Sequence, residues 1–170
     1  MGGPRRRSRA VALQILHQMD VSPELDAEAG LVLYFSQLAA PGGELAVDED
    51  EPAPADPGGQ AADSGGRSSE VGPIDRGLVE QLIRGVFRHR AELDQMLVAA
   101  SKNWRLERMA LVDRNVIRLA LYEIKHCSDV PVAVAINEAI ELTKRFGTAE
   151  ASAFVNGLLD RAVDELGLRR

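Results

Sequence analysis

Apolar residues recur at helical spacing along most of this chain. In residues 5–20, Val11, Ile15 and Met19 fall on one stripe, while Arg9 faces elsewhere. The same spacing predicts further helices over residues 24–39, 75–90, 91–101, 113 to the break at Val130-Pro131, 131–146 and 149–166. No segment sustains the period-two alternation that is typical of a β-strand. The pattern therefore predicts an all-α fold, a single helical bundle of about six or seven helices.

Residues that start or stop helices support these limits. Asp75 is a suitable N-cap for the third helix, and Asp113 opens the strongly patterned fifth helix. Pro131 suits the first turn of the next helix, and Gly147 is expected to cap its end.

Residues 41–74 break the pattern, because they are rich in Gly, Pro, Ser and acids and have almost no large apolar side chain. Such a segment cannot bury enough surface to offset its ordering entropy. A long surface loop costs a domain little, since closure entropy grows slowly with length. We therefore expect residues 1–170 to form one domain with a disordered acidic loop at about 41–74.

Composition favours helices with an aliphatic core, because 45% of residues are hydrophobic but only 4% are aromatic. The single cysteine, Cys127, excludes an internal disulfide framework and a multi-cysteine zinc site. No stretch approaches the roughly 20 apolar residues that cross a bilayer. We expect a cytoplasmic protein that does not enter a membrane.

The net charge of −6 conceals an uneven distribution. Residues 44–75 hold nine acidic residues and one basic residue, and the rest of the chain holds 19 basic against 17 acidic residues. Four arginines fall within the first nine residues. An acidic total therefore does not exclude nucleic acid as a partner.

The chain lacks the motifs of common catalytic sites. It has no Gly-rich phosphate loop before a helix and no Gly-x-Ser-x-Gly elbow. His17, His89 and His126 are far apart and lack metal-ligand spacing, and Glu138 and Glu141 fit a solvated, salt-bridged face. We expect no enzyme activity, no cofactor and no metal.

Two sets of residues could bind RNA. The first is an arginine cluster that leads into the first helix, followed by an amide and an imidazole near the same side: Arg5, Arg6, Arg7, Arg9, Gln14 and His17. Guanidinium groups bind phosphates and stack on unpaired bases. A frayed, solvated terminus is the alternative interpretation.

The second set combines the basic pair Lys144 and Arg145 with Phe154 and Asn156. A basic pair with an aromatic ring and an amide could hold a flipped-out base, whereas Phe154 could equally belong to the core. Asn137 and Glu138 stand on an otherwise apolar helix. For them we favour a hydrogen-bonded tie between helices.

Residues 103–160 contain, in this order, the pieces NWRLER, DRNVIRLALYE, VPVAVAINEA, KRFG and FVNG. With these pieces the segment resembles the C-terminal half of the NusB family. The N-terminal RRRSRAVALQIL is similar to the family's Arg-rich first helix and is correctly placed. Together the matches cover about 75 residues.

The resemblance implies a helical fold of two packed subdomains. It also implies binding of single-stranded boxA RNA with NusE, a small-subunit ribosomal protein, within the RNA polymerase antitermination complex. On this chain it assigns RNA contacts to the two sets above and partner contacts to Asp113, Tyr122 and Glu123. A homodimer is left open.

The chain departs from the family pattern in three places. The acidic loop is longer than usual, Ala153 stands where a basic residue is common, and His17 stands where Tyr is common. Weaker binding to RNA alone is expected. The alternatives are a stand-alone relative of the helical domain fused to ribosomal-RNA cytosine methyltransferases, and a helical protein-interaction module.

Overall fold

The computed structural model describes residues 3–39, 73–102, 105–148 and 150–168, and these form seven α-helices and one 3-10 turn without a strand. The elements are α1 (Pro4–Val21), α2 (Ala27–Ala39), α3 (Arg76–Arg88), α4 (Arg90–Ala100), η1 (Leu106–Arg108), α5 (Leu111–His126), α6 (Val132–Phe146) and α7 (Ala151–Glu165). The predicted all-α class is confirmed. The predicted acidic loop lies outside the described residues, except for its last two positions.

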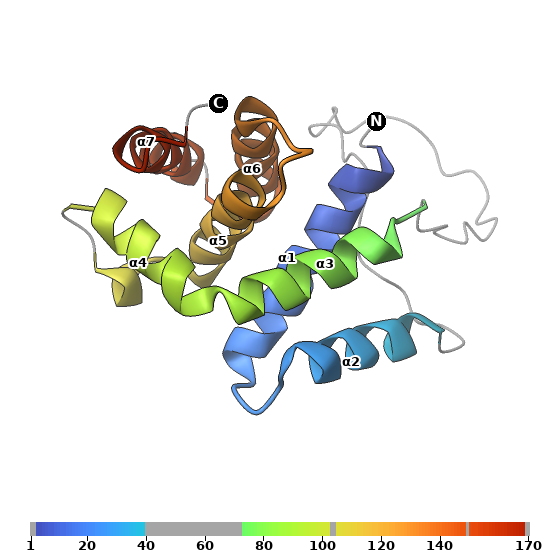
Figure 1. Cartoon of the computed structure of the whole chain (residues 1–170). Coiled ribbons are helices and arrows are strands. Elements are labelled where there is room, and N and C mark those ends of the chain that lie inside the picture. Colours follow the sequence, from blue (N-terminus) through green and yellow to red (C-terminus); the bar gives the residue numbers. More distant parts are fainter. Residues whose placement is uncertain (1–2, 40–72, 103–104, 149, 169–170) are drawn as a thin grey trace, which may run out of the picture.

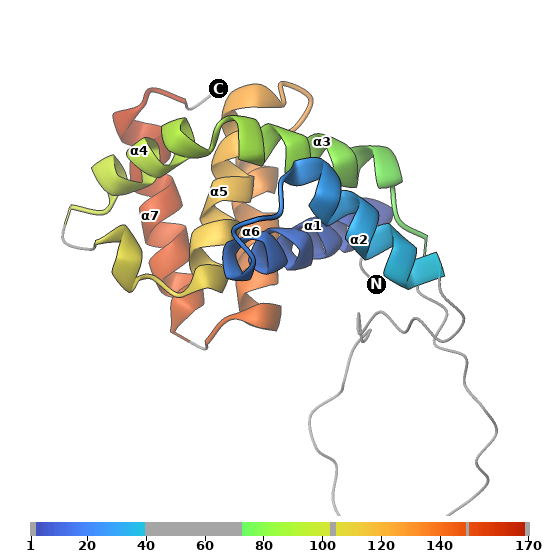
Figure 2. The ribbon, with the colours of Figure 1, turned by 90° about the horizontal axis from the view of Figure 1, so that it is seen from below.

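The helices form two packed groups (Figures 1 and 2). In the first group α1, α2 and α3 pack on one another, and in the second α4, α5, α6 and α7 do so. The groups meet where α1 and α3 pack against α5. Ten of the 16 residues of α5 are buried, so α5 is the centre of the molecule.

The core is aliphatic, as the composition indicated, and includes Val11, Ile15 and Met19. The buried surface of α1 is wider than the predicted stripe, because every residue in 8–13 is buried. The reason is that α1 packs against α2, α3, α5 and α6 and so has neighbours on most sides.

Three helix ends follow the predicted chemistry with differences in detail. The Asp75 carboxylate accepts a hydrogen bond from the Leu78 N–H at 3.0 Å, which confirms the N-cap. Pro131 precedes the first turn of α6 as its N-cap instead of lying within it. Gly147 does cap α6, but its φ of −100° is accessible to any residue. Glycine is needed there because a Cβ would lie 2.8 Å from the Thr143 carbonyl oxygen.

A buried polar network joins the two helix groups. Asp20, at the end of α1, pairs with Arg90 of α4 and with Arg118 of α5 at 3.3 Å. Asn115 donates to the same Asp20 carboxylate at 2.9 Å, and Arg118 also pairs with Asp94 at 2.7 Å. Each buried charge thus has a partner, which is the condition for burying charge without a large penalty. Over the described residues, no helix combines the length and apolarity needed to cross a membrane.

Candidate nucleic-acid interface

The arginine cluster lies on the first turns of α1, where the chain enters the helix. Gly3 is the N-cap and Pro4 occupies the first helical turn, a position that suits proline because no backbone donor is required there. The unpaired N–H groups of a helix N-terminus carry partial positive charge. The guanidinium groups of this turn therefore stand in a field that favours anions.

Arg5 and Arg7 are the arginines of the cluster that are most accessible to a ligand, because the other two each form a close ion pair with a buried carboxylate. The Arg5 side chain is 61% exposed and pairs loosely with the exposed Asp129 at 3.5 Å. The half-buried Arg7 donates to the Pro73 carbonyl oxygen at 3.1 Å, next to α3. An exposed ion pair of this kind contributes little to stability, so Arg5 can exchange Asp129 for another anion at small cost.

Arg6 is committed more firmly to the protein. Its guanidinium pairs with Glu138 of α6 at 2.7 Å and lies 3.9 Å from Glu141. The hydrogen bond to Glu138 raises the pKa of Arg6. Glu138 therefore is the tie between helices that its place on an apolar helix predicted.

Arg9 corrects the prediction, because the structure buries it. Its side chain is 5% exposed and pairs with Glu123 of α5 at 2.8 Å and with Glu138 at 3.6 Å. Burial acts to lower the pKa of Arg9, but hydrogen bonds and charge from these carboxylates outweigh it and raise the pKa. Arg9 is therefore engaged in ion pairs of the fold and offers a ligand little exposed surface.

A hollow of about 260 Å³ opens beside this turn. Arg5, Arg6 and Glu138 line it, together with the segment from Asp129 to Pro131 that joins α5 to α6. A second hollow, of about 230 Å³, is lined by Arg5 and by the start of α3, including Gly77 and Leu78. Arg5 thus lines two concave surfaces.

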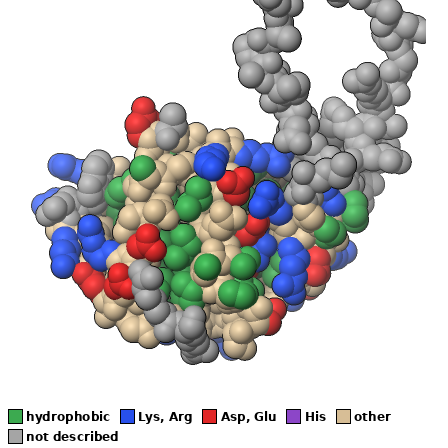
Figure 3. Space-filling model, turned by 90° about the horizontal axis from the view of Figure 1, so that it is seen from above, with side chains coloured by type: hydrophobic (Ala, Val, Ile, Leu, Met, Phe, Trp, Pro, Cys, Tyr) green, Lys and Arg blue, Asp and Glu red, His purple; other side chains and the backbone are tan. Residues whose placement is uncertain are grey.

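The charge around the cluster is nearly balanced. Four carboxylates surround the four arginines, namely Glu123, Asp129, Glu138 and Glu141. Figure 3, which looks onto this end of the molecule, shows Lys and Arg side chains interleaved with Asp and Glu. The surface is therefore not uniformly basic, and its attraction for a phosphate chain is moderate.

Gln14 and His17 are separated from the arginines by the buried stretch of α1. The half-buried Gln14 accepts a hydrogen bond from the Tyr34 hydroxyl at 3.1 Å, and His17 is exposed. Along a helix, the eleven steps from Arg6 to His17 span about 16 Å. The two ends of α1 thus offer separate contacts.

Lys144 and Arg145 lie on the last turn of α6 and are exposed. Lys144 pairs with Glu141 at 2.9 Å, and Glu141 also lies 3.9 Å from Arg6. The hydrogen bond from Lys144 lowers the pKa of Glu141. The Arg145 guanidinium stands over the Phe146 ring at 5.2 Å. The basic pair therefore adjoins the arginine cluster through one shared carboxylate.

Phe154 and Asn156 are both half-buried on α7. The Phe154 ring packs against the core. Asn137 is exposed and therefore does not form the buried hydrogen-bonded tie between helices that we expected. The reason is that its side of α6 faces an apolar groove of about 380 Å³, which Ile136 and Val163 also line.

Of the three residues assigned to a partner, only Asp113 retains exposed surface. Tyr122 is buried at 8% exposure beneath α3, and the Glu123 side chain is 2% exposed against Arg9. The assignment of Tyr122 and Glu123 as direct contacts is therefore wrong. Asp113 is half-buried, and its buried Oδ1 has no hydrogen-bond partner. Burial raises the pKa of Asp113.

Sequence spacing missed one cluster of histidines. His89 and His126 are stacked with ring centroids 4.0 Å apart, and both contact Glu92. The hydrogen bond from Lys125 lowers the pKa of Glu92 to about 2. The i,i+3 spacing of His89 and Glu92 at a helix start was visible in the sequence, but the approach of His126 depends on the packing of α4 against α5.

The fold places the chain among small all-α proteins in which a group of three helices packs on a group of four. Within that class, the chain belongs to the NusB family, whose model matches residues 45–164.

Similar proteins extend over nearly the whole chain. "Transcription antitermination protein NusB" of Geobacter sulfurreducens is 42% identical over 164 residues, covering 96% of each chain. The protein of the same name from Myxococcus xanthus is 42% identical, covering 94% of each chain. A solved structure of T. maritima NusB superposes with a TM-score of 0.69 at 29% identity, over 97% of this chain and 94% of that one.

Proposed function

We propose that this chain is a transcription antitermination factor that binds single-stranded boxA RNA of ribosomal-RNA transcripts together with NusE, without catalysis and in the cytoplasm. The names of its relatives support the antitermination role. The observation that carries the RNA contact is the first turn of α1, where the 61% exposed Arg5 lines two hollows.

In this proposal Arg5 and Arg7 contact phosphates at the N-terminus of α1, and Lys144 and Arg145 extend the path along α6. Arg6 supports the surface from beneath through its pair with Glu138. Because Asp129, Glu138 and Glu141 offset much of the positive charge, the chain alone binds RNA weakly. A partner that adds phosphate contacts of its own then raises the affinity.

The Asp113 end of α5 is the proposed contact for NusE. Asp113 is half-buried near the turn after α6, where a Cβ on Gly147 would lie 3.2 Å from its buried Oδ1. A backbone or side-chain donor from a partner protein would bind the exposed part of the Asp113 side chain.

The test is fluorescence anisotropy with a labelled boxA RNA and a scrambled RNA of equal length, with and without NusE. We expect tighter binding of boxA than of the scrambled RNA, and a marked gain when NusE is added. Asp113→Asn should reduce the gain from NusE and leave binding of RNA alone unchanged. Equal affinity for both RNAs under every condition would contradict the proposal.

The balanced charge at α1 also supports a second candidate, a helical protein-interaction module that does not bind RNA. In that case the arginines serve only the ion pairs to α5 and α6. The same titration distinguishes the two, because this module would bind NusE or another protein and leave both RNAs free.

A further inference from the structure

Two histidines and a glutamate meet where α3 passes into α4 and where α5 ends. His89 Nδ1 and His126 Nε2 each lie 3.1 Å from Glu92 Oε2. These three donor atoms all lie within 4.8 Å of one another. The two rings thus already direct a nitrogen towards the same carboxylate oxygen.

We propose that His89, Glu92 and His126 form a binding site for a divalent cation of the zinc class. Two imidazole nitrogens and one carboxylate oxygen are ligands that Zn²⁺ accepts, whereas Ca²⁺ and Mg²⁺ prefer oxygen alone. With bonds of about 2.1 Å, tetrahedral ligands lie about 3.4 Å apart, close to the 3.1 Å that separates each imidazole nitrogen from Glu92 Oε2. Water would complete the coordination, since the site is open to solvent.

The backbone positions of the ligands are fixed by the helix ends that carry them. His89 joins α3 to α4, where its N–H donates to the Gly85 carbonyl and its own carbonyl accepts from the Leu93 N–H. Glu92 lies on the first turn of α4. His126 is the last residue of α5, and its ring stacks on the buried Tyr122 with centroids 5.4 Å apart. Metal binding therefore needs only side-chain rotation.

Lys125 neutralises the Glu92 carboxylate when no metal is bound. Its ammonium lies 2.5 Å from Glu92 Oε1, the second oxygen of the same carboxylate. Both side chains are 36% exposed, so Lys125 can turn into solvent. A bound dication would repel the ammonium, and Lys125 therefore competes with the metal.

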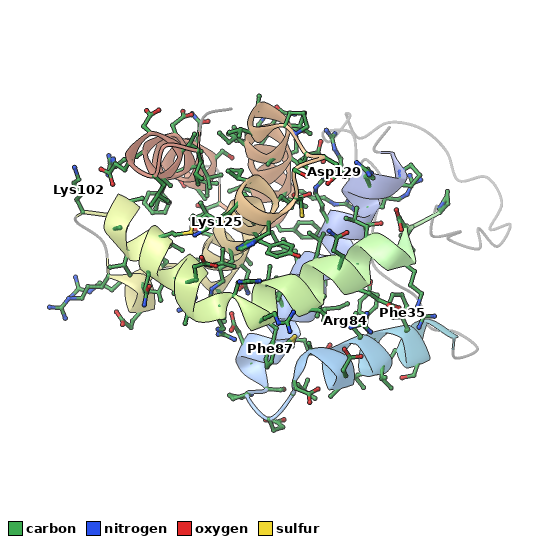
Figure 4. The ribbon with its side chains drawn as sticks, viewed as in Figure 1. Phe35, Arg84, Phe87, Lys102, Lys125 and Asp129 are labelled. Atoms are coloured by element: carbon green, nitrogen blue, oxygen red, sulfur yellow. The ribbon has the colours of Figure 1, made fainter. Side chains whose placement is uncertain are left out.

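A metal at this position would tie the junction between α3 and α4 to the end of α5. His89 lies between α3 and α4, and His126 is the last residue of α5. Figure 4 places Lys125 between α4 and α5, apart from Asp129 beside the arginine cluster. The site is therefore separate from the proposed RNA surface, and its expected effect is on the stability of the junction.

The experiment is a calorimetric titration of the full chain with ZnCl₂ near neutral pH, with the remaining histidine as internal control. We expect one Zn²⁺ per chain and a higher melting temperature with metal. His126→Asn and Glu92→Gln should each weaken binding by more than the roughly 10–100-fold that loss of an outer-shell partner costs. His17→Asn, at an exposed position on α1, should bind like the unmodified chain, as should Cys127→Ser.

Two further measurements bear on the geometry. In NMR spectra of the histidine side chains, Zn²⁺ should shift the signals of His89 and His126 and leave His17 in place. Lys125→Met should bind Zn²⁺ more tightly. The proposal is overturned if the folded chain takes up no Zn²⁺, if His126→Asn and Glu92→Gln retain full affinity, or if His17→Asn loses as much as they do. Circular dichroism of each metal-free variant confirms that it is folded.

Discussion

Arg5 and Arg9 lie one turn apart on α1, yet their environments are opposite. Arg5 is largely exposed beside Asp129, whereas Arg9 is buried against Glu123, which lies 114 residues away in the chain. The sequence predicts a run of guanidiniums on a helix, but it does not show which of them meet carboxylates from distant helices. The cluster therefore contains arginines that are accessible to a ligand, such as Arg5, and arginines that stabilise the fold, such as Arg9.

Arg9→Ala should therefore destabilise the protein strongly. Removing one member of a buried ion pair leaves Glu123 uncompensated, at a cost of about 3–5 kcal/mol in the free energy of unfolding. Arg5→Ala is the matched control and should change that free energy by about 0–1 kcal/mol, because its pair is exposed. Urea unfolding measures both. The double change of Arg9→Met with Glu123→Leu should recover most of the loss, and equal costs for Arg5→Ala and Arg9→Ala would contradict the assignment.

Asp113→Asn should stabilise the protein relative to the unmodified chain, and this difference in the free energy of unfolding should grow as pH increases. Burial raises the pKa of Asp113 above its ordinary 3.8, so between the two values the native state holds a proton that the unfolded chain has lost. The contribution of Asp113 to the free energy of unfolding is thus fully present below pH 3.8, and it is lost as pH rises through the raised pKa. Asparagine does not titrate, so the difference in unfolding free energy between variant and parent should grow between pH 3.5 and 7. A difference that shrinks over this interval would show an ion-paired carboxylate instead.

At the scale of helices, hydrophobic spacing predicted the elements well. Asp75 caps α3 as expected, and α6 ends at Gly147. The reason for Gly147 could not be seen in the sequence, because it is a close approach to the Thr143 carbonyl and not a left-handed conformation. Periodicity also could not show that α1 is buried over six successive residues, since that depends on how many helices surround it.

The crossing of α3 and α5 offers a test of helix packing. A Cβ on Gly85 would lie 2.0 Å from Tyr122 Cζ, whereas a Cβ on Gly157 of α7 meets no atom within 4 Å. Gly85→Ala should cost about 1–3 kcal/mol, because the rigid Tyr122 ring must move. Gly157→Ala should stabilise by about 0.5–1 kcal/mol, because alanine is the better helix former. Thermal unfolding of the two variants checks this, and the same sign for both would refute the packing described here.

At the scale of the whole molecule, the sequence predicted the fold class, the aliphatic core and the region of the candidate interface. The sequence did not predict which carboxylates pair with which arginines of α1. Asp129 follows α5 and Glu138 lies on α6, and both reach α1 only because these elements pack side by side. The same packing buries Tyr122 and Glu123, which removes them from any surface. Long-range pairing of charges is therefore what separates the predicted RNA-binding residues from those that stay accessible in the structure.

The most direct test of the account is the salt dependence of boxA RNA binding by the NusE-bound chain, compared between two double variants. Arg5→Ala with Arg7→Ala removes the exposed guanidinium of Arg5 and the half-buried one of Arg7 from α1. Arg105→Ala with Arg108→Ala removes two exposed arginines at η1, the short yellow turn after α4 that lies far from the start of α1 (Figures 1 and 2). The first pair should reduce the log–log slope by about 1.4, since each phosphate contact on a single strand contributes about 0.7. The second pair should leave the slope unchanged. An equal slope in both variants would show that RNA does not bind at the first turn of α1.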